Sequence, residues 1–237
     1  MANPAFNEKS FSGLKNDGES MTISGSINKS IILVSLTVLS AVLAWGYVDI
    51  FLPFLIPLVI GAFVFSLVII FKKETAPYLA PVYALLEGVV IATFSAFFET
   101  QYPGIVIQAV TATFAVFLTM LLLYKYRVIQ VTQKFRSGVI AATGAIAVLY
   151  IISILGSLTG WFEVPFLHSN GPLGIGISIF IVGIAAFNLL LDFDMIEQGS
   201  KAHAPKYMEW FAGFGLLITL VWLYLEVLRL LSKIRSK

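Results

Sequence analysis

The stretch LGIGISIFIVGIAAFNLLL, residues 173–191, contains no charged side chain, and Asp192 follows it directly. As an α-helix this stretch extends about 28 Å, close to the ~30 Å thickness of the hydrocarbon core of a bilayer. We therefore expect it to cross a membrane as a helix, with Asp192 inside or at the edge of the span. An ionised carboxylate in hydrocarbon costs about 3 kcal/mol on insertion scales, so an acid retained there indicates an ion or proton site.

The composition of the whole chain agrees with a membrane protein. Of its 237 residues, 59% are hydrophobic and 12% are charged, and the mean hydropathy is +0.93. A typical soluble domain has roughly 25% charged residues, so this chain has too little polar surface to be soluble. A net charge of +2 gives no indication of nucleic-acid binding. The absence of cysteine excludes disulfides and thiolate metal sites, and two histidines make a zinc site improbable.

Apolar stretches of spanning length repeat along the chain after a polar leader. Residues 1–29 are rich in Ser, Asn, Gly and charge, and we interpret them as a disordered cytoplasmic tail. Residues 30–237 are predicted to form one all-α, polytopic membrane domain, a bundle of seven transmembrane helices. The seven stretches are Ser30–Val48, Leu52–Phe71, Leu79–Phe98, Ile105–Tyr124, Gly138–Leu158, Leu173–Leu191 and Trp210–Leu231.

The basic residues predict the orientation of the helices. Eleven of the fifteen Lys and Arg residues lie in the leader or in alternate connections, and the three opposite connections have none. The positive-inside rule then places the N-terminus in the cytoplasm. The last four, Arg229, Lys233, Arg235 and Lys237, break the pattern. Either the C-terminus lies outside despite its charge, which seven crossings require, or the seventh segment re-enters and returns.

Two of the acids follow the sixth span. On a helix Asn188 and Asp192 share one face and can line one polar surface, whereas Asp194 points roughly 200° away from Asp192. Asp194 is therefore interpreted as a water-exposed group at the cytoplasmic end of the span. Asp192 lies two residues, about half a turn, deeper and is the stronger candidate for an ion or proton site.

Two further acids lie within spans. Glu226 has apolar neighbours and is followed by Arg229, so an ion pair within the helix is one interpretation and an ion site is the other. Glu87 lies near the middle of the third span, far from any basic residue in the sequence. We expect it to have a partner on another helix or to carry a proton, because burial disfavours the charged form.

A pair of such acids suggests how the protein works. Two nearby carboxyl groups in a low dielectric can share one proton, bind a hard cation when deprotonated and release it on protonation. Calcium accepts several oxygen ligands in irregular geometry. A pair of carboxylates among these acids would therefore give a physical route to a pH-controlled cation pathway.

The chain resembles the Bax inhibitor-1 (transmembrane Bax inhibitor motif) family, particularly its bacterial Bax inhibitor-1-like branch. The resemblance covers almost the whole chain and is carried by Asn3–Phe6, Pro81–Gly88, Tyr102–Gln108, Val131–Arg136, Asn188–Gly199 and Trp210–Leu231. It implies a seven-helix bundle with the last helix central, and a pH-sensitive calcium leak built on two aspartates.

Asp192, with Ile196 and Gly199, fits the spacing Asp-x-x-x-Ile-x-x-Gly that the resemblance implies for the first aspartate. Glu226, which follows Leu223-Tyr-Leu225, takes the place of the second, where a glutamate replaces the aspartate. The resemblance thus implies that Asp192 and Glu226 form a transient calcium site, and Glu87 is the alternative partner of Asp192. Straight helices would put Asp192 ~10 Å and Glu226 ~30 Å from the cytoplasmic turn. The two could meet if the sixth helix continues through Gln198 or if residues 206–211 lie along the membrane surface.

We therefore expect a pH-sensitive cation (calcium) leak channel or proton-coupled ion pathway in the bacterial plasma (inner) membrane, in contact with the lipid bilayer. No resident cofactor is expected beyond transient Ca²⁺. No enzyme is expected, because no histidine lies in a span and the best aspartate pair, Asp192 and Asp194, occupies different faces of one helix. The alternative is a non-transport membrane protein that binds partners and modulates a stress response or membrane protein quality control.

Overall fold

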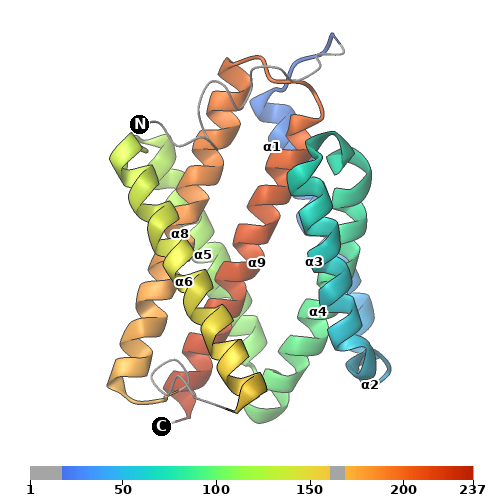
Figure 1. Cartoon of the computed structure of the whole chain (residues 1–237), viewed down its shortest axis with the longest axis vertical. Coiled ribbons are helices and arrows are strands. Elements are labelled where there is room, and N and C mark those ends of the chain that lie inside the picture. The colour runs from blue at the N-terminus through green and yellow to red at the C-terminus, as the bar shows by residue number, and fades with distance from the viewer. Residues whose placement is uncertain (1–17, 161–168, 237) are drawn as a thin grey trace. The chain divides into compact units, whose positions relative to one another are not determined.

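The computed structural model describes residues 18–160 and 169–236, and the regular secondary structure in these ranges is helical (Figure 1). Seven helical segments are long and apolar enough to cross a membrane, which confirms the predicted fold class. The elements are α1 (Ile23–Trp45), α2 (Val48–Phe51), η2 (Leu52–Phe54), α3 (Leu55–Phe71), η3 (Lys73–Thr75), α4 (Ala76–Gln101), α5 (Ile105–Lys125), α6 (Gln133–Thr159), α8 (Pro172–Lys201) and α9 (Met208–Arg235).

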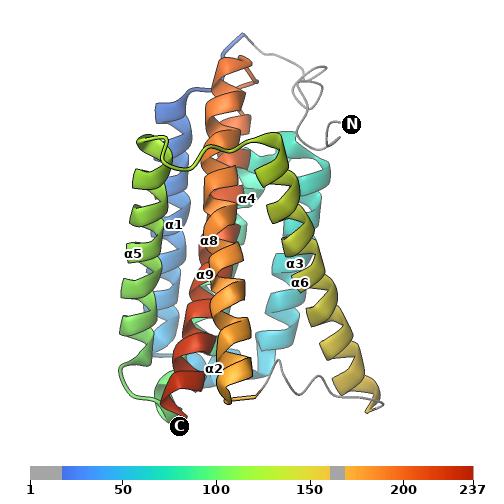
Figure 2. The same ribbon diagram turned by 90° about the vertical axis from the view of Figure 1, so that its left-hand side faces the viewer.

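Several helices are longer than the apolar stretches that predicted them. α1 begins at Ile23, inside the segment interpreted as a polar tail, and the rest of that tail up to residue 17 lies outside the described residues. α8 continues past Leu191 to Lys201 (Figure 2). It therefore passes through Gln198, which is one of the two conditions given above for Asp192 and Glu226 to meet. α9 runs unbroken from Met208 to Arg235, so the re-entrant alternative is wrong.

The helix ends follow from local chemistry. Thr22 and Thr132 are the N-caps of α1 and α6, where their side-chain oxygens accept hydrogen bonds from the backbone N–H groups of Gly25 (2.9 Å) and Phe135 (3.2 Å). Gly104 precedes α5 with a positive φ of 78°, a conformation that glycine adopts without steric cost.

The helices form two compact units, and α8 and α9 each contribute to both. Unit 1 contains Met1–Gln101 and Asp192–Val221, and unit 2 contains Tyr102–Leu191 and Trp222–Lys237. Residues 30–237 thus fall into two packed groups of helices, and the single domain expected over them stays a prediction.

Unit 1 includes a close contact between α1 and α4. A Cβ atom added at Gly88 would lie 2.3 Å from the backbone oxygen of Thr37 and 2.8 Å from the Cβ of Ser40, so only glycine permits this approach. The hydroxyl of Ser40 also donates to the backbone oxygen of Leu85 at 2.6 Å. Small residues and hydroxyl groups hold membrane helices together in this way, because lipid supplies no hydrophobic driving force.

Unit 2 has an apolar core between α6 and α8. Ile146 of α6 packs with Ile181 and Ile184 of α8, and Trp222 of α9 packs against this cluster. Edge-to-face stacking of Phe135 on Phe187, with ring centroids 5.5 Å apart, extends the α6–α8 contact.

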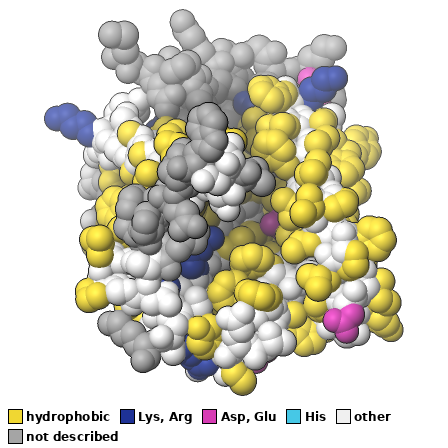
Figure 3. Space-filling view, turned by 60° about the horizontal axis from the view of Figure 1, so that its bottom comes forward, with side chains coloured by type: hydrophobic (Ala, Val, Ile, Leu, Met, Phe, Trp, Pro, Cys, Tyr) yellow, Lys and Arg dark blue, Asp and Glu magenta, His cyan; other side chains and the backbone are white. Residues whose placement is uncertain are grey.

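Burial separates α9 from the other spans. In its most apolar window 72% of the helix is buried, whereas no other span exceeds 44%, as expected for the central last helix that the resemblance implied. Hydrophobic side chains dominate the coloured surface of the helices in Figure 3, as expected of surfaces that contact lipid.

Candidate functional site

Asp192 lies on α8 in unit 1 and faces the first half of α9. Its Oδ1 is 3.9 Å from the position that a Cβ at Gly215 would occupy, and its side chain is hydrogen-bonded to that of Thr219. Its Oδ2 is buried and has no hydrogen-bond partner among the described residues. A buried carboxylate oxygen without a donor is costly, so this atom is an unsatisfied polar group within the span.

Thr219 has two possible acceptors for one hydroxyl proton. Its Oγ1 lies 3.2 Å from the backbone oxygen of Gly215, to which it can donate, and it is also hydrogen-bonded to Asp192. A threonine hydroxyl donates one hydrogen bond and accepts others. It can therefore donate to an ionised Asp192, or accept from a protonated Asp192 while donating to Gly215. The pair has two hydrogen-bonding states that differ by one proton on Asp192.

Asn188, predicted to share a polar surface with Asp192, is used for packing in unit 2. Its Nδ2 donates to the side-chain oxygen of Thr143 at 2.8 Å and to the backbone oxygen of Ile184 at 2.9 Å. The amide thus ties α8 to α6. Its role in an ion site stays a prediction.

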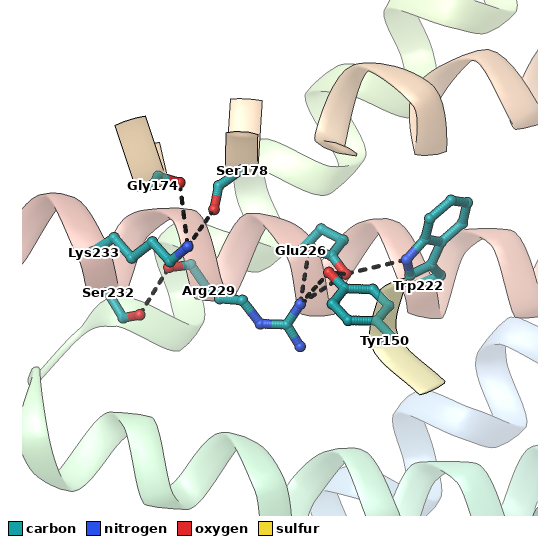
Figure 4. Close-up of polar contacts among 8 residues, drawn as sticks. All are labelled: Tyr150, Gly174, Ser178, Trp222, Glu226, Arg229, Ser232 and Lys233. Atoms are coloured by element: carbon teal, nitrogen blue, oxygen red, sulfur yellow. Dashed lines mark hydrogen bonds and ion pairs between the residues drawn. The ribbon is translucent and has the colours of Figure 1, made fainter. Parts of the chain in front are cut away.

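Glu226 is the centre of a hydrogen-bonded cluster in unit 2 (Figure 4). Its carboxylate is 2% exposed and forms an ion pair with Arg229, whose Nη1 donates to both carboxylate oxygens at 3.0 Å. The Tyr150 hydroxyl from α6 donates to Oε1 at 2.7 Å, and the indole N–H of Trp222 donates to Oε1 at 3.2 Å. Arg229 Nη1 also donates to the Tyr150 hydroxyl. The predicted ion pair within the helix is therefore confirmed.

The partners of the two acids bear on the predicted Asp192–Glu226 pair. Both oxygens of Glu226 already accept hydrogen bonds inside unit 2, whereas Asp192 contacts Thr219 inside unit 1. Thr219 precedes Glu226 by seven residues on α9. Shared binding of one cation stays a prediction for this pair.

Two other acids differ from what the sequence predicted. Asp194 is 5% exposed, so its interpretation as a water-exposed cap is wrong, and it lies in the buried part of α8. Glu87 has a side-chain hydrogen bond with Tyr83, one turn earlier on α4. This partner lies on the same helix and not on another one, because residues i and i+4 are neighbours on a helix surface. The other alternative, that Glu87 carries a proton, stays a prediction.

Sequence reasoning missed the buried cation Lys233. Its Nζ donates to the backbone oxygen of Gly174 at 3.2 Å and to the side-chain oxygen of Ser178 at 2.9 Å, both on α8, and its side chain is buried. The spacing of Glu226, Arg229 and Lys233, at i, i+3 and i+7, places all three on one helix face and could have indicated it. Tyr150 gave no such signal.

A further buried acid, Glu209, was also missed. It is 1% exposed at the start of α9, where its Oε1 accepts hydrogen bonds from the backbone N–H (3.0 Å) and hydroxyl (2.9 Å) of Thr22. Lys206 lies 3.3 Å away as an ion-pair partner. A Cβ at Gly25 would lie 2.0 Å from Oε1, so glycine makes room for the carboxylate. The positive end of the α1 helix dipole also stabilises the negative charge of Glu209 at this position.

Replacing Thr22 with alanine tests this contact. We expect Thr22→Ala to lower the free energy of unfolding by about 2 kcal/mol, since it removes an N-cap and also a donor to a buried carboxylate. Thr132→Ala removes only the N-cap of α6, and its expected cost is about 1 kcal/mol. Unfolding in detergent micelles, followed by circular dichroism, measures both. Equal losses of unfolding free energy in the two variants would show that the hydrogen bonds from Thr22 to Glu209 do not stabilise the protein.

A comparison with protein families found a match over almost the whole chain. Residues 3–236 match a family model described as Bax inhibitor 1 like. A comparison with curated proteins gave no match.

Proposed function

This chain belongs to the Bax inhibitor 1 like family of membrane proteins, and from that premise we propose that it is a pH-sensitive cation leak whose central group is Asp192. The multi-pass architecture places the protein in contact with the lipid bilayer. Calcium is the proposed cation, and no catalytic activity and no resident cofactor are proposed.

The observation that carries the proposal is the unpartnered Oδ2 of Asp192 in a membrane-spanning helix. Such an oxygen is stabilised either by a proton or by a cation. Thr219 beside it can donate to the ionised form or accept from the protonated form, and the backbone oxygen of Gly215 takes its proton in the second case. Protonation of Asp192 thus removes a cation ligand and changes the hydrogen bonding of Thr219.

The ligand set favours passage of a cation over tight binding. No group of three or more His, Cys, Asp or Glu side chains able to hold a metal occurs among the described residues. Calcium is bound tightly by six to eight oxygen ligands, several of them carboxylates. One carboxylate with hydroxyl and carbonyl oxygens nearby supports a weak and transient site, which conduction requires.

The proposal gives Glu226 a role different from that of Asp192. Its two oxygens are occupied by Tyr150, Trp222 and Arg229, so it is proposed to hold α6 to α9 rather than to ligate the cation. Glu87, with Tyr83 as its partner, is the remaining candidate for a second acid on the pathway.

Calcium flux into proteoliposomes tests the proposal. We expect wild-type flux to change between about pH 8 and pH 5.5, because one proton decides whether Asp192 is a cation ligand. Asp192→Asn fixes the neutral state and is expected to lower flux about tenfold and to remove its pH dependence. Thr219→Val, which keeps the shape but removes the hydroxyl, is expected to alter the pH dependence and retain flux.

Controls separate conduction from folding. Glu74→Gln removes an exposed acid outside the site and is expected to leave flux and its pH dependence unchanged. Asp192→Asn flux that equals wild-type flux at every pH would contradict the proposal. Capture of protein partners that persists in that variant would then favour a partner-binding membrane protein.

Orientation and location are part of the same proposal. The basic residues that follow α3, α5 and α8 are proposed to face the cytoplasm, together with the N-terminus, in a bacterial plasma membrane. Seven crossings then place the C-terminus on the opposite side. Cysteines introduced at Ser20 and Ser236 should be labelled by a membrane-impermeant maleimide from opposite sides of the membrane, and labelling from one side would contradict this topology.

A further inference from the structure

A short segment before α1 is paired with the turn that joins α8 to α9, and both belong to unit 1 (Figure 1). We call residues 19–22 the N-terminal strap. The backbone N–H of Met21 donates to the backbone oxygen of Ala204 at 2.7 Å. The backbone N–H of Lys206 donates to the backbone oxygen of Glu19 at 3.1 Å. These two antiparallel bonds fix the strap against the turn without making it part of a helix.

The side chain of Met21 completes an apolar layer at this turn. Met21 is 2% exposed and belongs to a buried cluster in which it is the member supplied by the strap. Met195 of α8 packs against the same cluster. The other buried members lie on α8, in the turn and on α9, and they are Ile196, Ala204, Met208 and Ala212.

This apolar layer lies between Asp192 and the turn. Ile196 follows Asp192 by one turn of α8, and Ala212 precedes Gly215 by about one turn of α9. A Cβ added at Gly215 would lie 3.9 Å from Oδ1 of Asp192 and 3.6 Å from the Cε of Met195. Met195 therefore contacts the layer on one side and borders the place of the carboxylate on the other.

Polar contacts hold the strap at both of its ends. At one end Thr22 donates to Oε1 of Glu209 through its backbone N–H at 3.0 Å and its hydroxyl at 2.9 Å. At the other end Glu19 lies 3.8 Å from Lys206 as an ion pair, and their side chains are 78% and 47% exposed. Water replaces such an exposed ion pair at little cost. A terminal segment held by a few bonds also opens more readily than a helix packed among other helices.

We propose that the N-terminal strap is a gate for Asp192. With Met21 in place the apolar layer excludes water and cations from this end of unit 1, because a narrow apolar constriction loses its water. Release of the strap withdraws Met21 and opens a path to the carboxylate. The effect of the gate on cation flux rests on the function proposed for Asp192, whereas its effect on the access of water to α8 does not.

Cysteine accessibility in proteoliposomes tests the gate without a measurement of flux. The chain has no cysteine, so Met195→Cys supplies a single thiol next to Asp192, and a cationic, membrane-impermeant methanethiosulfonate reagent probes it. In this background Met21→Ala is expected to raise the labelling rate about tenfold, because the layer loses its seal. Ile146→Ala truncates a buried side chain in the core of unit 2 and is expected to stay within about twofold.

A disulfide lock tests the gate in the opposite direction. Ser20 and Pro205 face each other between the two backbone bonds of the strap. The Cα atoms of such a pair are about 4.5 Å apart, a distance that a disulfide spans. Oxidation of Ser20→Cys/Pro205→Cys is expected to lower calcium flux about fivefold, and reduction to restore it. Flux through each single-cysteine variant is expected to be the same under oxidant and reductant.

The two measurements separate failure of the gate from failure of the proposed conduction. Faster labelling in Met21→Ala, with slow labelling restored by Met21→Leu, supports the gate even if no variant conducts calcium. Labelling that Met21→Ala does not accelerate overturns the gate, also where Asp192→Asn abolishes flux and the proposed function stands. Equal acceleration by Ile146→Ala overturns it as well, because general loosening of the helices would then explain the access.

Discussion

Replacing Glu226 with alanine is expected to lower the free energy of unfolding by about 3 kcal/mol. The substitution removes the acceptor for Tyr150, Trp222 and Arg229 together. The indole N–H of Trp222 and the O–H of Tyr150 then lose their acceptor in a segment that spans a membrane, while Arg229, which is partly exposed, can turn toward polar surroundings. Thermal or denaturant unfolding in mild detergent, followed by circular dichroism, measures the loss.

Matched variants show whether the cluster acts as a unit. Glu226→Gln keeps an acceptor for Tyr150 and Trp222 and is expected to cost about half as much as alanine. Tyr150→Phe combined with Glu226→Ala should cost less than the sum of the single losses, because both remove the same hydrogen bond. Glu74→Gln, at an exposed position, should stay within about 0.5 kcal/mol of wild type. A loss below about 1 kcal/mol for Glu226→Ala would refute a structural role for the cluster.

Replacing Gly88 with alanine is expected to destabilise unit 1 by about 2–3 kcal/mol. The new methyl group would lie 2.3 Å from the backbone oxygen of Thr37, so α1 and α4 must move apart. A backbone oxygen cannot move aside as the end of a flexible side chain can. Separation of α1 and α4 also breaks the hydrogen bond from the Ser40 hydroxyl to the backbone oxygen of Leu85. The same unfolding measurement reports the cost.

Gly61→Ala is the control for this substitution. Gly61 lies in α3, and a Cβ added there meets nothing within 4 Å. Alanine has the higher helix propensity, so Gly61→Ala is expected to leave stability unchanged or raise it by up to about 1 kcal/mol. Equal effects at Gly61 and Gly88 would show that close approach of α1 and α4 does not need glycine.

The spans were predictable because crossing a membrane depends on local composition. About 20 apolar residues in a row have few alternatives to a helix in lipid. Six of the seven predicted stretches lie within observed helical segments, and Ser30–Val48 runs three residues past the end of α1 at Trp45. The ends were less predictable. α8 continues ten residues beyond Leu191, since apolarity stops where the hydrocarbon stops but helical hydrogen bonding does not.

The candidate sites were predictable as residue types but not as contacts. Asp192 and Glu226 stood out because acids in apolar spans are costly, and Arg229 followed from its spacing to Glu226. Tyr150 is 76 residues from Glu226, and nothing local marks it. Glu209 was not predicted as a site residue, because its burial depends on Thr22, 187 residues away.

By itself, the sequence determined that this chain is a seven-helix membrane protein with acids in its spans, because hydrophobicity and charge are properties of each segment alone. The tertiary structure decided which acid is satisfied. Glu226 receives donors from two helices, Glu209 receives the N-terminus of a third, and one oxygen of Asp192 receives none among the described residues. That difference depends on which helices pack together, which no single segment encodes.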